Sequence, residues 1–303
     1  MDIIRFAYPN LPEKKDKLTM VLGFFDGMHR GHQSLFQEAR YVTKNLSSVL
    51  LFTSMPFKGK DSTCLMNLED KIRFLQGTGI DIAYVVETTD EFFALSPESF
   101  IKDFLLPLGV TQVVVGEDYT FGAKGKGKPE DLSKYLDVVT LPLLLEDGNK
   151  ISSSRLKEAI KMGNVEEASL MLGRPYEIVG KVIHGKKRGR TIGYPTVNLE
   201  LKAPYLLPKE GIYAGICYVL GKPYEALINV GMNPTFGELK EPLVEAHLRG
   251  YEGDCYGKTV YLSFARQGRG EKKFTGLEEL KEQLQKDEKW VASLDLLHPK
   301  RPN

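Results

Sequence analysis

The first half of the chain alternates short apolar runs with segments of helical periodicity. The apolar runs are nearly continuous and rich in valine, isoleucine and leucine, which is typical of parallel strands buried on both faces of a sheet. We expect strands at 18–23, 48–53, 82–87, 111–116 and 138–141, and helices at 32–43, 68–75, 97–106, just after 152–154 and at 164–172. This alternation predicts an open α/β sheet with right-handed crossovers.

The pattern changes after about residue 174. Strand-like runs occur at 176–183, 211–219, 224–230, 243–248 and 259–264. Turns rich in Gly, Pro and Asn separate them at the spacing of an antiparallel sandwich or barrel. A helix that carries Leu277, Leu280 and Leu284 on one apolar stripe closes this half. We therefore predict two domains, at 1–170 and 171–303.

Capping residues mark the ends of two of these helices. Asn164 with Glu167, and Thr275 with Glu278, have the spacing of a capping box at a helix start. Gly173 ends the helix at 164–172.

Composition excludes several classes of protein. The 303 residues are 42% hydrophobic and 27% charged, as in soluble globular proteins, and 41 Lys and Arg balance 40 Asp and Glu. Any basic site must therefore be local. The three cysteines are far apart with no C-x-x-C spacing, which favours a reducing compartment. The N-terminus lacks a signal peptide and no run is long enough to span a membrane, so we expect a cytoplasmic protein without a membrane partner.

The first candidate site is the segment 23–33, which follows the first of these strands and opens a helix. Ligands of open α/β sheets bind at the carboxyl ends of strands. Gly27 and Gly31 allow close backbone approach, and His29 and His32 add donors to the N–H groups of the helix start. The segment therefore predicts an anion site; the alternative is a glycine-rich turn with two incidental histidines.

Other nucleotide motifs fail. Residues 122–128 match the first seven positions of a P-loop, but Pro129 stands where Ser or Thr must bind magnesium. No G-x-G-x-x-G follows the first predicted strand. The series Lys124, Lys126 and Lys128 is most simply a solvated loop, and alternatively one that closes over phosphates.

Segment 23–33 resembles the H-x-G-H signature of the nucleotidyltransferase superfamily. Residues 116–122 and 151–154 extend the resemblance to the FMN adenylyltransferase module of the bacterial bifunctional riboflavin kinase/FAD synthetase family. The resemblance implies a Rossmann-like nucleotidyltransferase domain with a parallel sheet. It also implies His29 and His32 as catalytic residues, and as ATP-binding residues Gly23, Phe25, Asp26, Gly31, Asp118, Lys150, Ser153, Ser154 and Lys157.

Two departures from that family's pattern bear on the rate of adenylyl transfer. The family often has arginine where this chain has Lys150 and Lys157, and lysine lacks bidentate phosphate geometry. The family often shows a His-Pro pair where this chain has Met55 and Pro56.

The second candidate site is the run 180–198. Glycines interleave with basic residues at 185–193, so the loop can fold over a polyphosphate. Thr196 and Asn198 follow with hydroxyl and amide oxygens, which are hard ligands suited to magnesium. If the charges are considered alone, the alternative interpretation is a basic surface hairpin that touches nucleic acid.

This run resembles the riboflavin kinase module, a six-stranded antiparallel Greek-key β-barrel with a Pro-Thr-Ala-Asn motif, in which Val197 replaces the alanine. Segments 229–237 and 244–248 also match. The resemblance implies Glu245 as general base, although a strand residue that faces solvent would fit the same alternation. It implies ATP contacts at Gly185, Lys186 and Gly193, the metal ligands Thr196 and Asn198, and a flavin contact at Arg269.

The resemblance covers about residues 15–290 and implies FAD biosynthesis by two modules. The barrel would phosphorylate riboflavin to FMN with ATP and Mg²⁺, and the N-terminal domain would adenylylate FMN to FAD with release of pyrophosphate. The substrates would be riboflavin, FMN and ATP, and the protein a monomer or weak homo-oligomer that binds no nucleic acid. Alternatives are a protein with only FAD synthesis active, and a nucleic-acid-binding or regulatory protein that reuses the fold.

Overall fold

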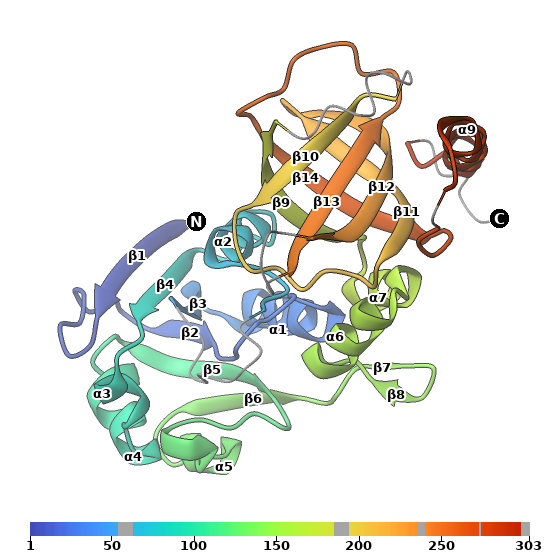
Figure 1. Cartoon of the computed structure of the whole chain (residues 1–303). Helices are drawn as coiled ribbons and strands as arrows, with labels where there is room; N and C mark the ends of the chain where they lie inside the picture. The colour runs from blue at the N-terminus through green and yellow to red at the C-terminus, as the bar shows by residue number, and fades with distance from the viewer. Residues whose placement is uncertain (54–62, 185–193, 235–239, 273, 298–303) are drawn as a thin grey trace. The chain divides into compact units, whose positions relative to one another are not determined.

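The computed structural model describes residues 1–53, 63–184, 194–234, 240–272 and 274–297 (Figure 1). The chain forms two compact units, Met1–Ser153 and Ser154–Asn303. The first contains a parallel sheet with helices, and the second contains a barrel (Figure 1). None of the helices in the described ranges is long and apolar enough to cross a membrane.

The first unit is built on a six-stranded parallel sheet. Its strands are β1 (Asp2–Ala7), β2 (Leu18–Val21), β3 (Leu46–Phe52), β4 (Ile82–Glu87), β5 (Val110–Gly116) and β6 (Asp137–Leu141). They lie in the order β1-β4-β3-β2-β5-β6, and each neighbouring pair is parallel. After β2, the chain adds β3 and β4 on one side of it and then β5 and β6 on the other side. The direction of strand addition therefore reverses between the adjacent strands β2 and β5. This is the topological switch point, at which α/β sheets bind their ligands.

Each face of this sheet carries its own apolar core. Alternate strand residues point to opposite faces, so Met20 belongs to one core and Val21 to the other. Helices α1 (Arg30–Val42) and α2 (Leu68–Gln76) pack on the Val21 face. The Met20 face is covered by α3 (Asp90–Phe93), the π-helix η1 (Phe100–Leu105) and α5 (Pro129–Leu132), and the single turn α4 (Pro97–Ser99) precedes η1. The predicted α-helix at 97–106 is thus a single α turn followed by a π-helix.

Short elements complete the first unit. They are the 3₁₀ turn η2 (Ala123–Gly125) and the two-stranded sheet of β7 (Leu145–Glu146) and β8 (Asn149–Lys150).

The second unit is a closed six-stranded antiparallel barrel. Its strands are β9 (Tyr176–Ile183), β10 (Thr196–Leu201), β11 (Gly211–Val219), β12 (Lys222–Pro234), β13 (Lys240–Leu248) and β14 (Thr259–Gln267). They close in the order β10-β13-β12-β11-β14-β9. Three consecutive strands, β11 to β13, are followed by β14, which returns to lie beside β11; this is the Greek-key pattern. The fold class predicted from the sequence is confirmed for both units.

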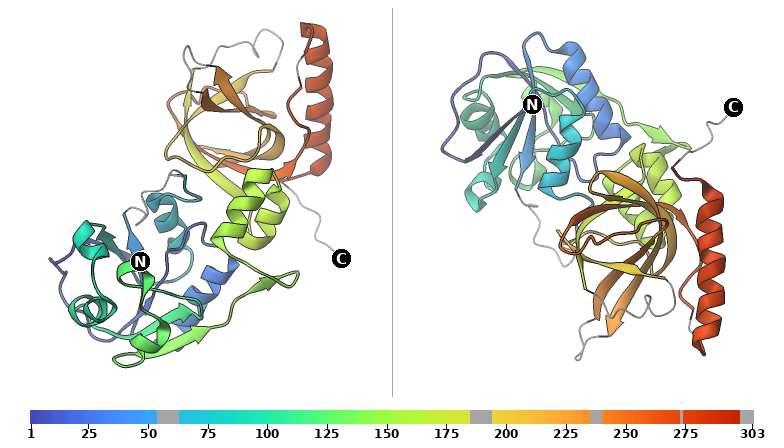
Figure 2. Two further views of the ribbon diagram at one scale, coloured as in Figure 1. Left: turned by 60° about the horizontal axis from the view of Figure 1, so that its bottom comes forward. Right: turned by 90° about the horizontal axis from the view of Figure 1, so that it is seen from above.

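Among the described residues, the helices α6 (Ser153–Met162), α7 (Val165–Leu172) and α9 (Leu277–Leu294) belong wholly or mainly to the second unit. The long helix α9 runs along the outside of the barrel (Figure 2). Its Leu284, Trp290 and Val291 pack on Ala214 and Leu227 of the barrel wall. Leu277 is exposed, so the predicted apolar stripe begins later on the helix.

Neither of the two predicted capping boxes forms between the predicted residues. Asn164 is the N-cap of α7 but makes no side-chain cap bond, and the Glu167 carboxylate instead accepts from Arg155 at 2.9 Å. Thr275 pairs through its backbone N–H and hydroxyl with Glu279, one residue beyond the predicted partner. The reason is that α9 starts one residue later than the sequence spacing implies, with Gly276 at its N-cap. Gly173 ends α7 in the left-handed region, as predicted.

Candidate functional site

A cavity of about 670 Å³ lies at the switch point of the parallel sheet. The segments that follow β2 and β5 both contribute to its wall, as do the residues between β6 and α6. Among the predicted site residues, the cavity is lined by Gly23, His29, Gly31, His32, Asp118, Lys150 and Ser153. The structure thus brings together in one cavity residues from three separate segments of the first unit.

The two histidines stack at the start of α1. Their ring centroids are 3.7 Å apart with planes 17° from parallel. His29 is the N-cap, and its Nδ1 accepts the backbone N–H of His32 at 3.4 Å. A neutral ring that accepts at Nδ1 carries its proton on Nε2. His29 can therefore offer an Nε2–H donor next to the N–H groups of the helix start.

His32 is held in its neutral form. Burial lowers its pKa well below the ordinary value, and the neighbouring His29 and Lys71 lower it further. Its ring rests edge-on against Phe25, with centroids 5.3 Å apart. Any contribution of His32 to an anion site is thus that of a neutral hydrogen-bonding group.

The loop between β2 and α1 has an unusual backbone. Phe25, Gly27 and Met28 all have positive φ angles, of 55°, 85° and 44°. Strained conformations of this kind cluster at binding sites, where the surroundings hold them. Gly31 is also constrained, because a Cβ there would lie 3.2 Å from Nδ1 of His29. The loop geometry therefore depends on the small residues that the sequence places there.

Positive charge reaches the cavity from strand β8 and from the turn η2. Lys150 forms an ion pair with Asp118, and both side chains are partly exposed. Lys124 lines the same cavity from the short η2 turn, where its φ is 59°. The basic series at 124–128 thus contributes at least one cation to the cavity wall.

Two predicted residues lie beneath the cavity rather than on its wall. Phe25 is completely buried in the core on the α1 face. Asp26 is buried, and its carboxylate accepts the backbone N–H of Leu65 at 3.0 Å. The hydroxyl of Ser153 donates to the backbone carbonyl of Asp26 at 2.8 Å. Both positions therefore support the loop, and their predicted contact with ATP stays a prediction.

Lys157 and Ser154 belong to the second unit, so their predicted contacts with ATP stay predictions.

Sequence reasoning missed the aromatic part of the cavity wall. These residues come from five separate segments: Phe24, Phe52, Phe92 and Phe93, Phe100, and Tyr119 and Phe121. Burial raises the pKa of the Tyr119 phenol, which therefore stays protonated. Such a wall suits a flat aromatic ligand, because aromatic rings stack and pack edge to face. The only signal in the sequence is the high density of Phe between 92 and 104, which also serves the core.

The second candidate site is a row of polar residues across three barrel strands. Asn198 of β10 lies opposite Glu245 of β13, which in turn lies opposite Asn229 of β12. Directly opposed residues on antiparallel strands project to the same face. On the next row Thr196 lies opposite His247, again on that face. The sheet register thus groups the predicted base with the predicted metal ligands.

His247 ties this row to its surroundings. Its Nδ1 lies 2.9 Å from the carbonyl of Pro195, the residue before Thr196. Its Nε2 lies 4.0 Å from a carboxylate oxygen of Glu288 on α9. The ring also packs edge-on against Tyr194. The backbone that carries Thr196 is therefore held from two sides, by strand pairing and by this side chain.

The residue types in this row fit a hard divalent cation. Thr196 and Asn198 are two apart on one strand, so the hydroxyl and amide oxygens face the same way. In the described ranges, no group of three or more His, Cys, Asp or Glu is arranged to hold a metal ion. A cation at Thr196 and Asn198 would be held by neutral oxygen ligands, with the carboxylate residue Glu245 opposite Asn198.

Only some of the other residues predicted for this site lie in the described ranges. Gly185, Lys186 and Gly193 lie outside the described residues, as do Met55 and Pro56. Arg269 is described, and its guanidinium is engaged by Asp287, so its flavin contact stays a prediction. A further cavity of about 500 Å³ is lined by residues 207–210 and 230–232. Its Gly231 follows Asn229 by two residues, at the end of the polar row.

Family models match both units. The riboflavin kinase model matches residues 172–294, and the FAD synthetase model matches residues 11–155. The two matches follow one another along the chain without overlap.

Curated relatives match over nearly the whole length. The bifunctional riboflavin kinase/FMN adenylyltransferase of Bacillus subtilis is 38% identical, over 95% of this chain and 96% of the relative. The protein of the same name from Listeria monocytogenes is 40% identical, over 89% of this chain and 90% of the relative. That from Escherichia coli K12 is 34% identical over 95% of this chain and 96% of its own length.

A solved structure also resembles the chain. A crystal structure from Streptococcus pneumoniae, named as a macrolide-efflux protein, is 32% identical with a TM-score of 0.87 and covers 95% of this chain and 99% of its own. That name differs from those of the curated relatives, which agree with both family models. By these matches the chain belongs to the bifunctional riboflavin kinase/FMN adenylyltransferase family.

Proposed function

We propose that this protein makes FAD in two steps, one in each unit. The barrel transfers the γ-phosphoryl group of ATP to the 5′-hydroxyl of riboflavin. The first unit transfers the adenylyl group of a second ATP to the FMN so formed. The observation that carries the proposal is that one chain holds both a histidine-lined cavity at a switch point and a Thr–Asn–Glu row on a barrel.

In the first unit, a phosphate oxygen of FMN attacks the α-phosphorus of ATP. A bond forms between them as the bond from the α-phosphorus to the bridging oxygen breaks, and pyrophosphate leaves with the electron pair. No protein nucleophile is needed, so the residues act by orienting and by stabilising charge. His29 donates from Nε2 to the phosphates, together with the N–H groups that begin α1, while Lys150 and Lys124 supply positive charge.

The aromatic wall supports a position for the flavin in the same cavity. Phe24 and Phe52 stack with ring centroids 5.7 Å apart, and Tyr119 stacks with Phe121 at 5.8 Å. A flavin ring between such groups would be held by stacking and by exclusion of water. The polar end of the cavity at His29 and Lys150 would then hold the phosphates of both substrates.

In the barrel, Glu245 takes the proton of the 5′-hydroxyl as that oxygen attacks the γ-phosphorus, and ADP leaves. Thr196 and Asn198 would hold Mg²⁺, which when bound offsets the phosphate charge. The cavity at 207–210 and 230–232 would hold the riboflavin ring.

We infer a cytoplasmic location as well, because all three cysteines are free, as in a reducing compartment.

The proposal is tested by incubating the purified protein with riboflavin, ATP and Mg²⁺ and separating the flavins by chromatography over time. We expect FMN to appear first and FAD after a lag, since FMN is the substrate of the second step. Conversion of added FMN alone, with riboflavin untouched, would mean that only the first unit is active.

Two variants separate the activities, each serving as the other's control. His29→Ala removes a donor at the phosphates, so FAD formation should fall about 10²–10³-fold while FMN formation persists. Glu245→Gln removes the base, so FMN formation should fall roughly 10²–10⁴-fold while adenylylation of added FMN persists. Equal loss of both activities in either variant would contradict the division of labour.

A further inference from the structure

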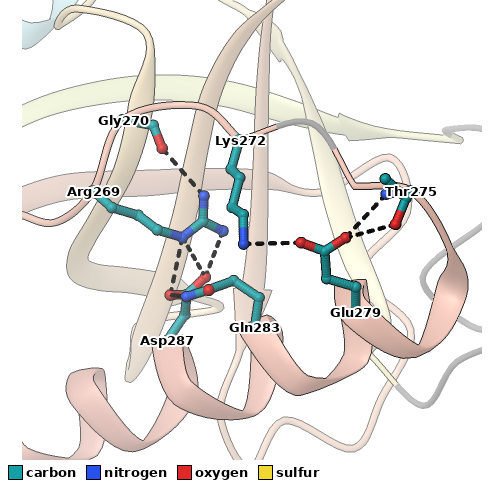
Figure 3. A network of polar contacts seen from close by, with 7 residues as sticks. All are labelled: Arg269, Gly270, Lys272, Thr275, Glu279, Gln283 and Asp287. Carbon is teal, nitrogen blue, oxygen red and sulfur yellow. Dashed lines mark hydrogen bonds and ion pairs between the residues drawn. The ribbon is translucent and has the colours of Figure 1, made fainter.

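A buried carboxylate on α9 organises the segment that follows the last barrel strand. Asp287 is 6% exposed. Arg269 donates to it from Nε, at 3.2 Å to each oxygen, and from an Nη at 2.7 Å, and Gln283 donates at 2.8 Å (Figure 3). A buried charge is stable only when paired and hydrogen-bonded, and this one has both.

This contact fixes the segment 268–272 against the barrel. Ile212 of β11 accepts the N–H of Gly268 through its carbonyl and donates its own N–H to the carbonyl of Arg269, both at 2.8 Å. A Cβ at Gly268 would lie 2.9 Å from the ring of Trp290, so that ring rests on the segment. Arg269 also lies over the ring of Phe274, 5.6 Å from its centroid. The segment is thus held between β11 and α9.

The same segment reaches Gly231, a residue of the barrel cavity's wall. A Cβ at Gly231 would lie 2.8 Å from a carboxylate oxygen of Glu271, so that carboxylate sits against the backbone of Gly231. Gly231 lines the cavity, and Asn229, two residues earlier, is in the row with Glu245. The position of Glu271 behind this wall residue therefore depends on how the segment is held at Arg269, two residues away.

We propose that Asp287 is a positioning residue for riboflavin in the kinase reaction, acting through Arg269 on the segment that carries Glu271. The inference rests on the proposed function of the barrel. Asp287 touches neither substrate nor metal; it holds the cavity wall in the form that binds the flavin. Its loss therefore weakens flavin binding more than it slows the transfer step.

The test is steady-state kinetics of FMN formation by Asp287→Asn in the full-length protein. Asparagine keeps the shape and loses the charge that pairs with Arg269. We expect the KM for riboflavin to rise about tenfold, within the usual range of coupling between two positions. The kcat and the KM for ATP should change less than about twofold. Adenylylation of added FMN by the first unit should be unchanged and reports on the amount of folded protein.

Trp290 gives a readout that is independent of activity, because it is the one tryptophan of the chain. Release of the segment in Asp287→Asn should expose its ring and shift its emission to longer wavelength. The matched control is Glu278→Gln, which removes an exposed carboxylate of the same helix that forms an ion pair with Lys281. Control emission and KM should match those of the unmodified protein.

The remaining outcomes are decisive. An unchanged KM for riboflavin in Asp287→Asn, or a fall in kcat with KM unchanged, overturns the inference. If Asp287→Asn does not fold, Gln283→Leu, which removes one of the same hydrogen bonds, must raise the KM for riboflavin, and an unchanged KM overturns it. If the unmodified protein forms no FMN, the proposed function fails. Riboflavin affinity, measured by quenching of Trp290, then decides the inference separately.

Discussion

Burial determines the chemistry available to His32. Its pKa lies well below the ordinary value because burial, His29 and Lys71 all disfavour the protonated ring. The ring is therefore neutral at physiological pH and cannot supply a charge to a phosphate. The cations of this site are the lysines, which are partly or fully exposed. Under the proposed function, substrate phosphates would meet charge at the rim and neutral donors deeper in the cavity.

This protonation state makes the stability of the first unit depend on pH. The unfolded state gains a proton below about pH 6.5, whereas folded His32 resists it, so stability is full above that pH and falls as pH decreases toward the folded pKa. The loss should approach about 1.4 kcal/mol per pH unit. Hydrogen exchange of the α1 amides between pH 8 and pH 5 measures it. His32→Gln should make stability depend less on pH, whereas His184→Gln, at an exposed position, should not. An equal pH dependence of stability in the unmodified protein and both variants would assign the effect to another group.

Local motifs predicted the histidine side of the first cavity but not its aromatic side. His29, Gly31 and His32 are close in sequence, and the chemistry of a helix start explains why they act together. The aromatic rings come from segments far apart in the chain and have no spacing of their own. Apolar periodicity assigns such residues to the core, and only the folded sheet shows that Phe52 and Phe100 also face a cavity.

Elements with strong apolar runs were predicted best. Strands β4, β9 and β11 have the bounds that the sequence predicts. Strand β1 was missed because it lies at the sheet edge, where Asp2 and Arg5 are exposed and dilute the pattern. Strand β10 was missed because its first alternating residues belong to the Pro-Thr-Val-Asn motif. They were interpreted as metal ligands and not as strand residues. The capping partners could not be predicted, since the exact helix start decides them.

Close packing of the barrel strands gives a prediction for β11. Its register with β14 shifts between Ala214 and Gly215, and a Cβ at Gly215 would lie 1.8 Å from the carbonyl oxygen of Ser263. Gly215→Ala should therefore destabilise the barrel by about 3 kcal/mol or more, the upper range for overpacking, because backbone cannot move aside as a side chain can.

Thermal unfolding followed by Trp290 fluorescence measures this effect. FMN formation should be lost with it, while adenylylation of added FMN persists. Gly270→Ala is the matched control, because a Cβ there meets no atom within 4 Å. A melting temperature for Gly215→Ala equal to that of the control would contradict the packing argument.

At the scale of the whole molecule, each unit has its own core and its own candidate site. The sequence predicted both fold classes because the periodicity changes between the two halves and each half is consistent within itself. It also predicted the family, because several short motifs occur in one order along the chain. The contacts of α9 with the segment 268–272 lay beyond such reasoning, because they join residues through the folded barrel.

The three cysteines should be inert in the native protein. Burial raises the pKa of Cys64 to about 11 and that of Cys217 to about 12, and it also raises the pKa of Cys255. Thiolate, the reactive form, is then scarce at neutral pH. Iodoacetamide at pH 7.5 should add no mass to the native protein within minutes and three adducts in urea. Gln37→Cys, exposed on α1, should gain one adduct rapidly; rapid modification of an original cysteine would contradict the burial argument.

The two sheets also differ in how they would behave toward other copies of the chain. Every strand of the closed barrel is paired on both sides, so it offers no open row of backbone groups to a neighbouring molecule. The parallel sheet ends at β1 and β6, and each carries charged residues, Asp2 and Arg5 on one and Asp137 on the other. Charges at an open edge oppose strand exchange and aggregation. Substitutions that neutralise these few residues would thus endanger solubility without touching either reaction.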